Sequence, residues 1–222
     1  MKKLLCAASL SITLLFAFSG CRHVGKGIQG SGVRKTEKRD LGTFKTIETT
    51  GAYEVQITCQ QAASFEIEGD DNILRLIRTE VRGGVLRISN DAGYRATKAI
   101  VVRISIPDLE GIVSQGAGDI HITNVKNDKL AIRLTGASRI EAAGQTEFLG
   151  IMTTGAGKID AYGLHAKRAE VTVTGAGKAD VYASEQLDAT VSGVGQVTYD
   201  GDPEVVNKHV SGIGSVNKKG GA

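Results

Sequence analysis

The chain has 222 residues, of which 23% are charged and 5% are aromatic, and its formal net charge is +3. Removal of the first 20 residues would take away Lys2 and Lys3 and lower that charge to +1. So small a positive excess argues against nucleic-acid binding, which needs a concentrated basic surface. The length allows a single domain with its own core.

Residues 1–20 are predicted to be a lipoprotein signal peptide. Lys2 and Lys3 form a charged head, and the apolar run from Leu4 to Phe18 is too short to span a bilayer comfortably. The run ends in Ser19-Gly20-Cys21, which resembles a bacterial lipobox with Cys21 as the lipidated mature N-terminus. The alternative is an ordinary signal peptide followed by a chance cysteine.

Residues 21–40 are rich in glycine and charge and are predicted to be a flexible tether. Of the three cysteines, Cys6 lies in the signal peptide and Cys21 in the lipobox, so Cys59 is left without a partner for an internal disulfide. We expect Cys59 to behave as a small buried hydrophobic residue.

Residues 41–107 form a β-rich but irregular N-terminal part of the predicted domain, which spans residues 41–218. Thr50-Gly51-Ala52 is a variant of a phrase repeated later, so residues 44–58 are predicted to be a degenerate first coil. One helical turn is expected near residues 72–77. Gly83-Gly84 between two strand-like runs predicts a hairpin, and residues 99–106 predict a strand that stops at Pro107.

Residues 108–218 contain one short phrase, Thr/Ser-Gly-Ala-Gly and its variants, six times. The first glycines of the six copies are Gly116, Gly136, Gly155, Gly175, Gly193 and Gly212. A period of about 20 residues indicates a solenoid. The runs on both sides of each glycine alternate apolar and polar residues, which is typical of half-buried strands, and the glycines suit a corner with positive φ. We therefore predict an all-β fold, a parallel β-helix with one repeat per coil.

Alignment of the coils places outward side chains in columns. Column one contains Asp119, Arg139, Lys158, Lys178 and Gln196; column two contains His121, Glu141, Asp160, Asp180 and Thr198; column three contains Thr123, Ala143, Tyr162, Tyr182 and Asp200. The predicted inward positions are Ile120/Ile122, Ile140/Ala142, Ile159/Ala161, Ala179/Val181 and Val197/Tyr199.

The columns allow two interpretations. A basic column beside an acidic one offsets the repulsion between stacked like charges, and such exposed pairs contribute little else. Alternatively the strip binds a ligand. Its candidate residues are Tyr162, Tyr182, Lys158, Lys178, Asp160, Asp180 and Glu141, with the tyrosines stacked as an aromatic step for a sugar ring and the carboxylates able to hold a cation.

Several phrases resemble one known family: Leu41-Gly-Thr-Phe-Lys-Thr-Ile-Glu48, Ile106-Pro-Asp-Leu109 and the serial Gly-Ala-Gly turns. It is the auto-transporter adhesin head GIN domain family, common among Bacteroidetes lipoproteins. The resemblance covers residues 41–218 and implies a right-handed, single-stranded β-helix with an adhesin-type role. The chain departs from the repeat at Ser138, Val194 and Ile213, which affects the expected geometry of those corners.

No motif for catalysis, a cofactor or a metal is recognised. The Gly-Ala-Gly turns lack the third glycine and following helix of a dinucleotide fingerprint, and the four histidines show no zinc spacing. We expect a non-catalytic outer membrane lipoprotein of the cell envelope, on its periplasmic side or at the cell surface. It would contact the membrane through its lipid alone and bind a glycan or protein through the β-helix surface, with self-association left open. The alternatives are a polysaccharide-processing β-helix enzyme and a structural envelope protein.

Overall fold

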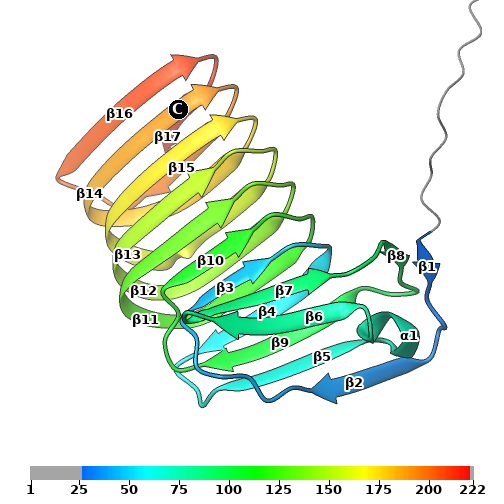
Figure 1. Cartoon of the computed structure of the whole chain (residues 1–222). Helices are drawn as coiled ribbons and strands as arrows, with labels where there is room; N and C mark the ends of the chain where they lie inside the picture. The colour runs from blue at the N-terminus through cyan, green and yellow to red at the C-terminus, as the bar shows by residue number, and fades with distance from the viewer. Residues whose placement is uncertain (1–26, 221–222) are drawn as a thin grey trace, which may run out of the picture.

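The computed structural model describes residues 27–220, which form a β-solenoid of about five turns (Figure 1). The strands facing the viewer run toward a row of corners, and the chain returns behind them. Each turn then lies further from the N-terminal part than the one before it, which is the right-handed sense. The predicted fold class is confirmed.

The regular coils stack as parallel strands in register. Their elements are β10 (Gly111–Ser114), β11 (Asp119–Leu134), β12 (Arg139–Thr153), β13 (Lys158–Gly175), β14 (Lys178–Gly193), β15 (Gln196–Asp200), β16 (Val205–Gly212) and β17 (Ser215–Lys218). The longest of these cover a whole coil, because pairing continues around the bend opposite the corners. The turns are therefore joined by backbone hydrogen bonds along their strands, and further backbone hydrogen bonds join successive corners.

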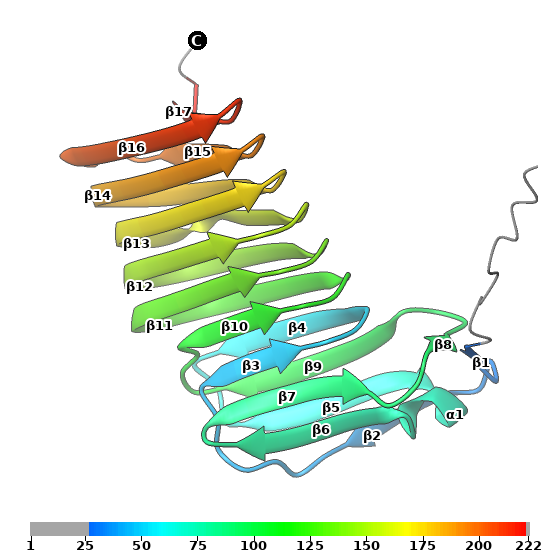
Figure 2. The same ribbon diagram turned by 45° about the horizontal axis from the view of Figure 1, so that its top comes forward.

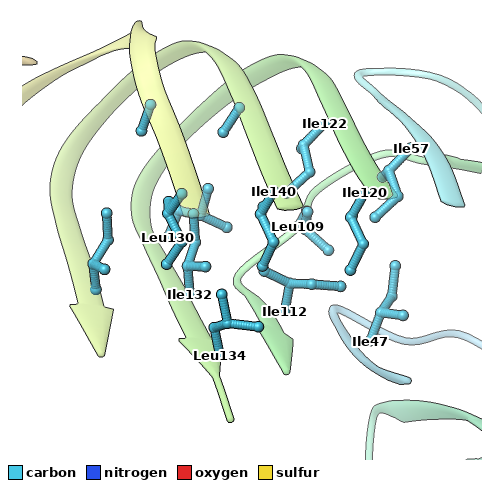
Figure 3. Close-up of a cluster of buried hydrophobic side chains, with 14 of the residues drawn as sticks. Ile47, Ile57, Leu109, Ile112, Ile120, Ile122, Leu130, Ile132, Leu134 and Ile140 are labelled. Atoms are coloured by element: carbon cyan, nitrogen blue, oxygen red, sulfur yellow. The ribbon is translucent and has the colours of Figure 1, made fainter. Parts of the chain in front are cut away.

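Columns of aliphatic side chains fill the interior of the solenoid (Figure 3). One column pairs Ile120, Ile140 and Ile159 across successive coils, and another pairs Ile112, Ile132 and Ile151. Every inward position predicted from the sequence is buried. Because alternate residues of a strand point to opposite faces, burial of one set leaves the other set on the outer surface, where ligands can reach it.

The corner glycines (the six first glycines of the repeats) stack directly on one another. The N–H of Ala137 donates to the Gly116 carbonyl at 3.1 Å, and the N–H of Ala156 donates to the Gly136 carbonyl at 3.3 Å. A Cβ on Gly155 would lie 2.3 Å from the Gly136 oxygen. The prediction of positive φ is right for Gly175, at 107°, but wrong for Gly155, where close backbone approach is the reason for glycine.

Ser138 stands where the other regular corners have their second glycine, and it preserves the corner. Its side chain is buried and turned inward, with Oγ 2.8 Å from the Ser114 Oγ and 3.2 Å from the Gly116 carbonyl oxygen. The next corner still forms its hydrogen bond, from the Lys158 N–H to the Ser138 carbonyl at 3.0 Å. The hydroxyl is thus accommodated because two polar partners lie within reach.

Two further coils belong to the N-terminal part, and they stack out of sequence order. The predicted coil over residues 44–58 is confirmed as β3 (Thr46–Thr49) and β4 (Tyr53–Cys59), which pair in parallel with β10 and β11. On its other side lie β7 (Val85–Asn90) and β9 (Ile100–Ile106), so this coil is not the terminal one in space (Figure 2).

Antiparallel strands close the N-terminal end of the solenoid. The hairpin expected at Gly83-Gly84 joins β6 (Ile77–Arg82) to β7, and β5 (Ser64–Asp70) pairs with β9. The single helix of the described chain is α1 (Asp71–Leu74), shorter than the turn expected near it.

Two short stretches of residues 21–40, which the sequence predicts to be a flexible tether, form paired strands. β2 (Arg34–Lys38) pairs with β5, and β1 (Ile28–Gln29) pairs with β8 (Tyr94–Arg95). Alternating charged residues fit an edge strand whose outward side chains remain in water, which is why composition alone suggested a linker.

Cys59 is buried, and burial raises the pKa of its thiol to about 11, which leaves it in the unreactive protonated form at neutral pH. The predicted signal peptide and Cys21 lie outside the described residues. Within residues 27–220, no helix combines the length and the apolar character needed to cross a bilayer.

Candidate functional site

The first two outward columns exist as the sequence predicts. Arg139, Lys158 and Lys178 lie opposite one another on β12, β13 and β14, and Glu141, Asp160 and Asp180 do the same. The repeated corner sets this register, because each second strand begins immediately after it. The basic and acidic columns therefore run side by side along one face.

Four charged residues of this face form ion pairs with one another. We call Lys158, Asp160, Lys178 and Asp180 the charged ladder. The Lys158 Nζ lies 3.2 Å from the Asp160 Oδ2 and 3.5 Å from the Asp180 Oδ2, and the Lys178 Nζ lies 3.4 Å from the Asp180 Oδ1. A hydrogen bond to Asp160 raises the pKa of Lys158. The side chain of Asp180 is only 3% exposed, so the residue expected on the surface is covered.

Tyr162 lies over the charged ladder. The Lys219 Nζ is 4.4 Å from the centre of the Tyr162 ring and 3.0 Å from the Asp200 Oδ2. Burial, followed by the nearby charge of Asp180, raises the pKa of the Tyr162 phenol. One face of the ring is therefore occupied by a cation from the C-terminal segment.

Glu141, the remaining acidic candidate, is paired with a histidine. Its Oε2 lies 3.1 Å from the Nδ1 of His121 in the preceding coil. Within residues 27–220, no group of three or more histidine, cysteine, aspartate or glutamate side chains is placed to hold a metal ion. The structure thus does not bring Glu141, Asp160 and Asp180 together as a cation site.

Tyr182 does not lie beside Tyr162, and the predicted aromatic step between them is wrong. Tyr162, Gly163 and Leu164 are additional residues in β13, so the register resumes with His165 opposite Tyr182. The two rings stack with centroids 4.4 Å apart and planes 15° apart. Tyr182 follows Asp180 by two residues on the outward side of β14, and its ring lies against His165 on the outer face at the bend opposite the corners.

That face carries an open depression of about 500 Å³, which we call the side groove. Its lining residues belong to β11, β12, β13 and β14, near the bend opposite the corners; Figure 2 shows the course of these strands. One wall is a column of paired residues, the polar column, which consists of Lys126, Gln145, His165 and Tyr182. The floor includes Thr146 and Ala166, which are 4% and 2% exposed. Small residues between longer ones give the surface its concave shape.

The polar column differs from the charged ladder in having no polar partners. The side chains of Lys126, Gln145, His165 and Tyr182 make no hydrogen bond or ion pair with another residue of the described range. On the opposite wall, the Lys167 Nζ lies 2.8 Å from the Glu147 Oε2. The groove therefore holds unpaired donors and acceptors beside an aromatic stack, which is a composition suited to ligand binding.

Sequence alignment of the coils missed Lys126, Gln145 and His165. The one available signal was the unequal repeat length, since the corner glycines at 155, 175 and 193 are separated by 20 and then 18 residues. An alignment that starts from the corner glycines places the whole difference in repeat length after column three. It therefore keeps Tyr162 and Tyr182 in one column.

Comparison with known proteins identifies the family of the chain. A family model described as "Putative auto-transporter adhesin, head GIN domain" matches residues 43–203. The chain belongs to this family. The family name indicates an adhesin-like role at the cell envelope or surface, rather than an enzyme. Among curated proteins, no sequence matches this GIN-domain protein.

Solved structures share its fold. A "putative adhesin" from Bacteroides fragilis NCTC 9343 is 27% identical, with a TM-score of 0.71 over 86% of this chain and 100% of that one. A "putative lipid binding protein" from Parabacteroides distasonis ATCC 8503 is 24% identical, with a TM-score of 0.54 over 87% of this chain and 99% of that one. At that lower identity the likeness concerns the fold alone.

Proposed function

We propose that this GIN-domain protein is a non-catalytic, lipid-anchored adhesin of the cell envelope, which captures an extended glycan or protein on the side of its solenoid. The observation that carries the proposal is the side groove, whose polar column is unpaired. The charged ladder is the second candidate surface, but its ammonium and carboxylate groups are already ion-paired with one another, so a ligand would have to displace existing ion pairs.

A solenoid suits the capture of polymers. Successive coils are about 4.8 Å apart, so equivalent side chains meet an extended ligand at regular intervals. The backbone of each coil is fixed by its neighbours, so little conformational entropy is lost when the ligand binds. Several weak contacts along one polymer then add to a useful affinity.

The enzyme alternative would need two carboxyl groups that flank a bound sugar with a defined separation and different protonation states. In the side groove, Glu147 is ion-paired with Lys167 and both side chains are about half exposed. This arrangement favours a contact surface over an acid–base pair.

Binding is tested with the soluble domain, residues 22–222, on an array of glycans and matrix proteins. We expect capture by the wild type, reduced capture by Tyr182→Ser, and unchanged capture by Tyr162→Ser as a matched control on the charged ladder. Failure of the wild type to capture any probe would reject the adhesin proposal. Loss of capture in Tyr162→Ser alone would move the site to the charged ladder and its neighbour Glu141.

The lipid anchor is proposed from the sequence of the signal region, with Cys21 as the modified residue and the outer membrane as the destination. We expect wild-type protein from cells to partition into detergent, and Cys21→Ser to remain unprocessed or become soluble. Surface proteolysis of intact cells distinguishes the cell surface from the periplasmic side. A processed Cys21→Ser protein that still partitions like the wild type would rule the anchor out.

A further inference from the structure

We infer that the side groove binds a linear, predominantly neutral glycan, with one sugar ring against the His165–Tyr182 stack and neighbouring hydroxyls bonded to Gln145 and Lys126. This inference rests on the proposed function and names the ligand class for the same site. It differs from the strip predicted from sequence, because the register of β13 places Tyr182 in the groove rather than on the charged ladder.

The aromatic stack provides a fixed aromatic surface. His165 comes from β13 and Tyr182 from β14, and each ring restricts the rotation of the other at a centroid distance of 4.4 Å. A sugar ring presents C–H groups on one face, and these pack on an aromatic face at low cost because the aromatic side chain has few rotamers to lose. The rest of a glycan chain would then follow the groove across β12 and β11.

The polar column supplies the hydrogen bonds that a chain of hydroxyls requires. The Gln145 amide offers a donor and an acceptor, the Lys126 ammonium offers donors, and His165 offers one of each in its neutral form. All are unpaired within residues 27–220. The Thr146 hydroxyl on the floor of the groove already donates to the Phe148 carbonyl at 3.2 Å. The hydrogen bonds that select the ligand therefore come from the polar column.

The charge of the groove favours a neutral polymer over a polyanion. Lys167 is paired with Glu147, and Lys126 shares its end of the groove with Asp128, so positive and negative groups alternate along the surface. A polyanion would meet carboxylates as well as ammonium groups and would gain little net attraction.

A peptide fits this groove less well than a glycan. The N–H and C=O groups of the coils beneath it are used in the parallel ladders between β11, β12, β13 and β14. A bound peptide strand needs a free sheet edge to satisfy its own backbone. Free edges of the stack lie at β16 and β17, away from the side groove.

Binding of soluble xylan, mannan and a β-glucan to residues 22–222 tests the inference, with polygalacturonate as the charged probe and fibronectin as the protein probe. We expect one neutral polysaccharide to bind, with an affinity that falls roughly tenfold in Tyr182→Ala through loss of the aromatic contact. Gln145→Ala, a change at an exposed residue that should not affect folding, should also weaken binding, while Tyr162→Ala should not.

The outcomes separate the inference from the proposed function. Binding of a neutral polysaccharide that is unaffected in both Tyr182→Ala and Gln145→Ala would overturn the groove assignment but leave the adhesin role. Capture of polygalacturonate or fibronectin alone would overturn the ligand class. Absence of binding to every polysaccharide and to fibronectin would overturn the inference, and an empty result on the wider array would reject the adhesin role as well.

Discussion

At the scale of single residues, the corner glycines are required for two different reasons. Gly175 has a φ of 107°, a conformation that side chains rarely adopt, whereas Gly155 lies so close to the previous coil that an added Cβ would meet the Gly136 oxygen. Glycine is thus required at position 175 by the backbone conformation and at position 155 by the short distance to the previous coil.

We predict that Gly155→Ala and Gly175→Ala each lower the free energy of unfolding by about 1–3 kcal/mol, the first through steric displacement and the second through backbone strain. Gly93→Ala is the matched control, because its Cβ would have no atom within 4 Å and its φ is not positive. Urea denaturation measures all three. Equal midpoints for Gly155→Ala and Gly93→Ala would show that the corner yields without cost.

Asp70 fastens the N-terminal segment to the capped end of the solenoid. Its carboxylate accepts hydrogen bonds from the Thr97 hydroxyl at 2.6 Å, the Thr97 N–H at 2.8 Å and the Gly32 N–H at 3.0 Å. These bonds, led by that of the Thr97 hydroxyl, hold the pKa of Asp70 below its usual value. Hydrogen bonds from Arg34 and Arg103 likewise lower the pKa of Glu68.

The stabilisation from Asp70 is therefore present above its unfolded pKa near 3.9 and lost as the pH falls through the lower folded value. We predict that at about pH 2–3 the amides of residues 30–38 exchange hydrogen faster than those of β13, once both rates are corrected for intrinsic exchange. Asp70→Asn should loosen this segment already at neutral pH, while Asp119→Asn, an exposed control, should not. Uniform protection of residues 30–38 across this range would show that the carboxylate does not control the attachment.

At the scale of elements, the repeat predicts strands, corners and the inward columns, because alternation and glycine spacing are local signals. It misplaces Tyr182, because the three additional residues of β13 change the register beyond Ala161 and only the packed coils decide where they bulge. β2 was missed for a related reason: its charged sequence has no apolar face of its own, and its partner β5 lies far away in the chain, with Lys35 opposite Gly69, for example.

The Ser114–Ser138 pair is a buried polar contact between the end of β10 and the corner that precedes β12. We predict that Ser138→Ala destabilises the protein by about 1–3 kcal/mol, because the buried Ser114 hydroxyl loses its partner. The double change Ser114→Ala and Ser138→Ala should cost less than the sum of the single changes, since both polar groups are then removed. Additive free energies of unfolding in this double-mutant cycle would indicate that the two hydroxyls do not interact.

At the scale of the whole molecule, the two ends of the solenoid differ. The N-terminal end is closed by β2, β5 and β6, of which the edge strands β2 and β6 carry charged residues, whereas β16 pairs only with β14 and β17 only with β15. In the last coil Lys208 occupies the inward position opposite the buried Ala189, with its Nζ 4.9 Å from the Tyr199 ring centre. An inward-pointing charge at an edge discourages another chain from pairing there.

We predict that Lys208→Val makes the protein self-associate through β16, since it removes that charge and adds an apolar side chain beside the exposed Val210. Sedimentation velocity over a range of concentrations should show dimers or larger species for Lys208→Val. The wild type should show a smaller fraction of such species at the same concentrations. Lys129→Val, at an exposed position in the middle of the stack, is the control for a general loss of charge. Identical sedimentation of Lys208→Val and wild type would contradict this role of Lys208.

The out-of-order stacking of the N-terminal coils bears on how the chain is assembled during synthesis. A chain that has been synthesised as far as residue 107 already contains β7 and β9, the strands that cover one side of the coil formed by β3 and β4. The nascent domain then has a finished base and one growing surface, to which β10 and β11 attach next. Each later repeat pairs with the one before it in sequence order, so gain or loss of a coil in evolution can change the length of the solenoid while its base stays the same.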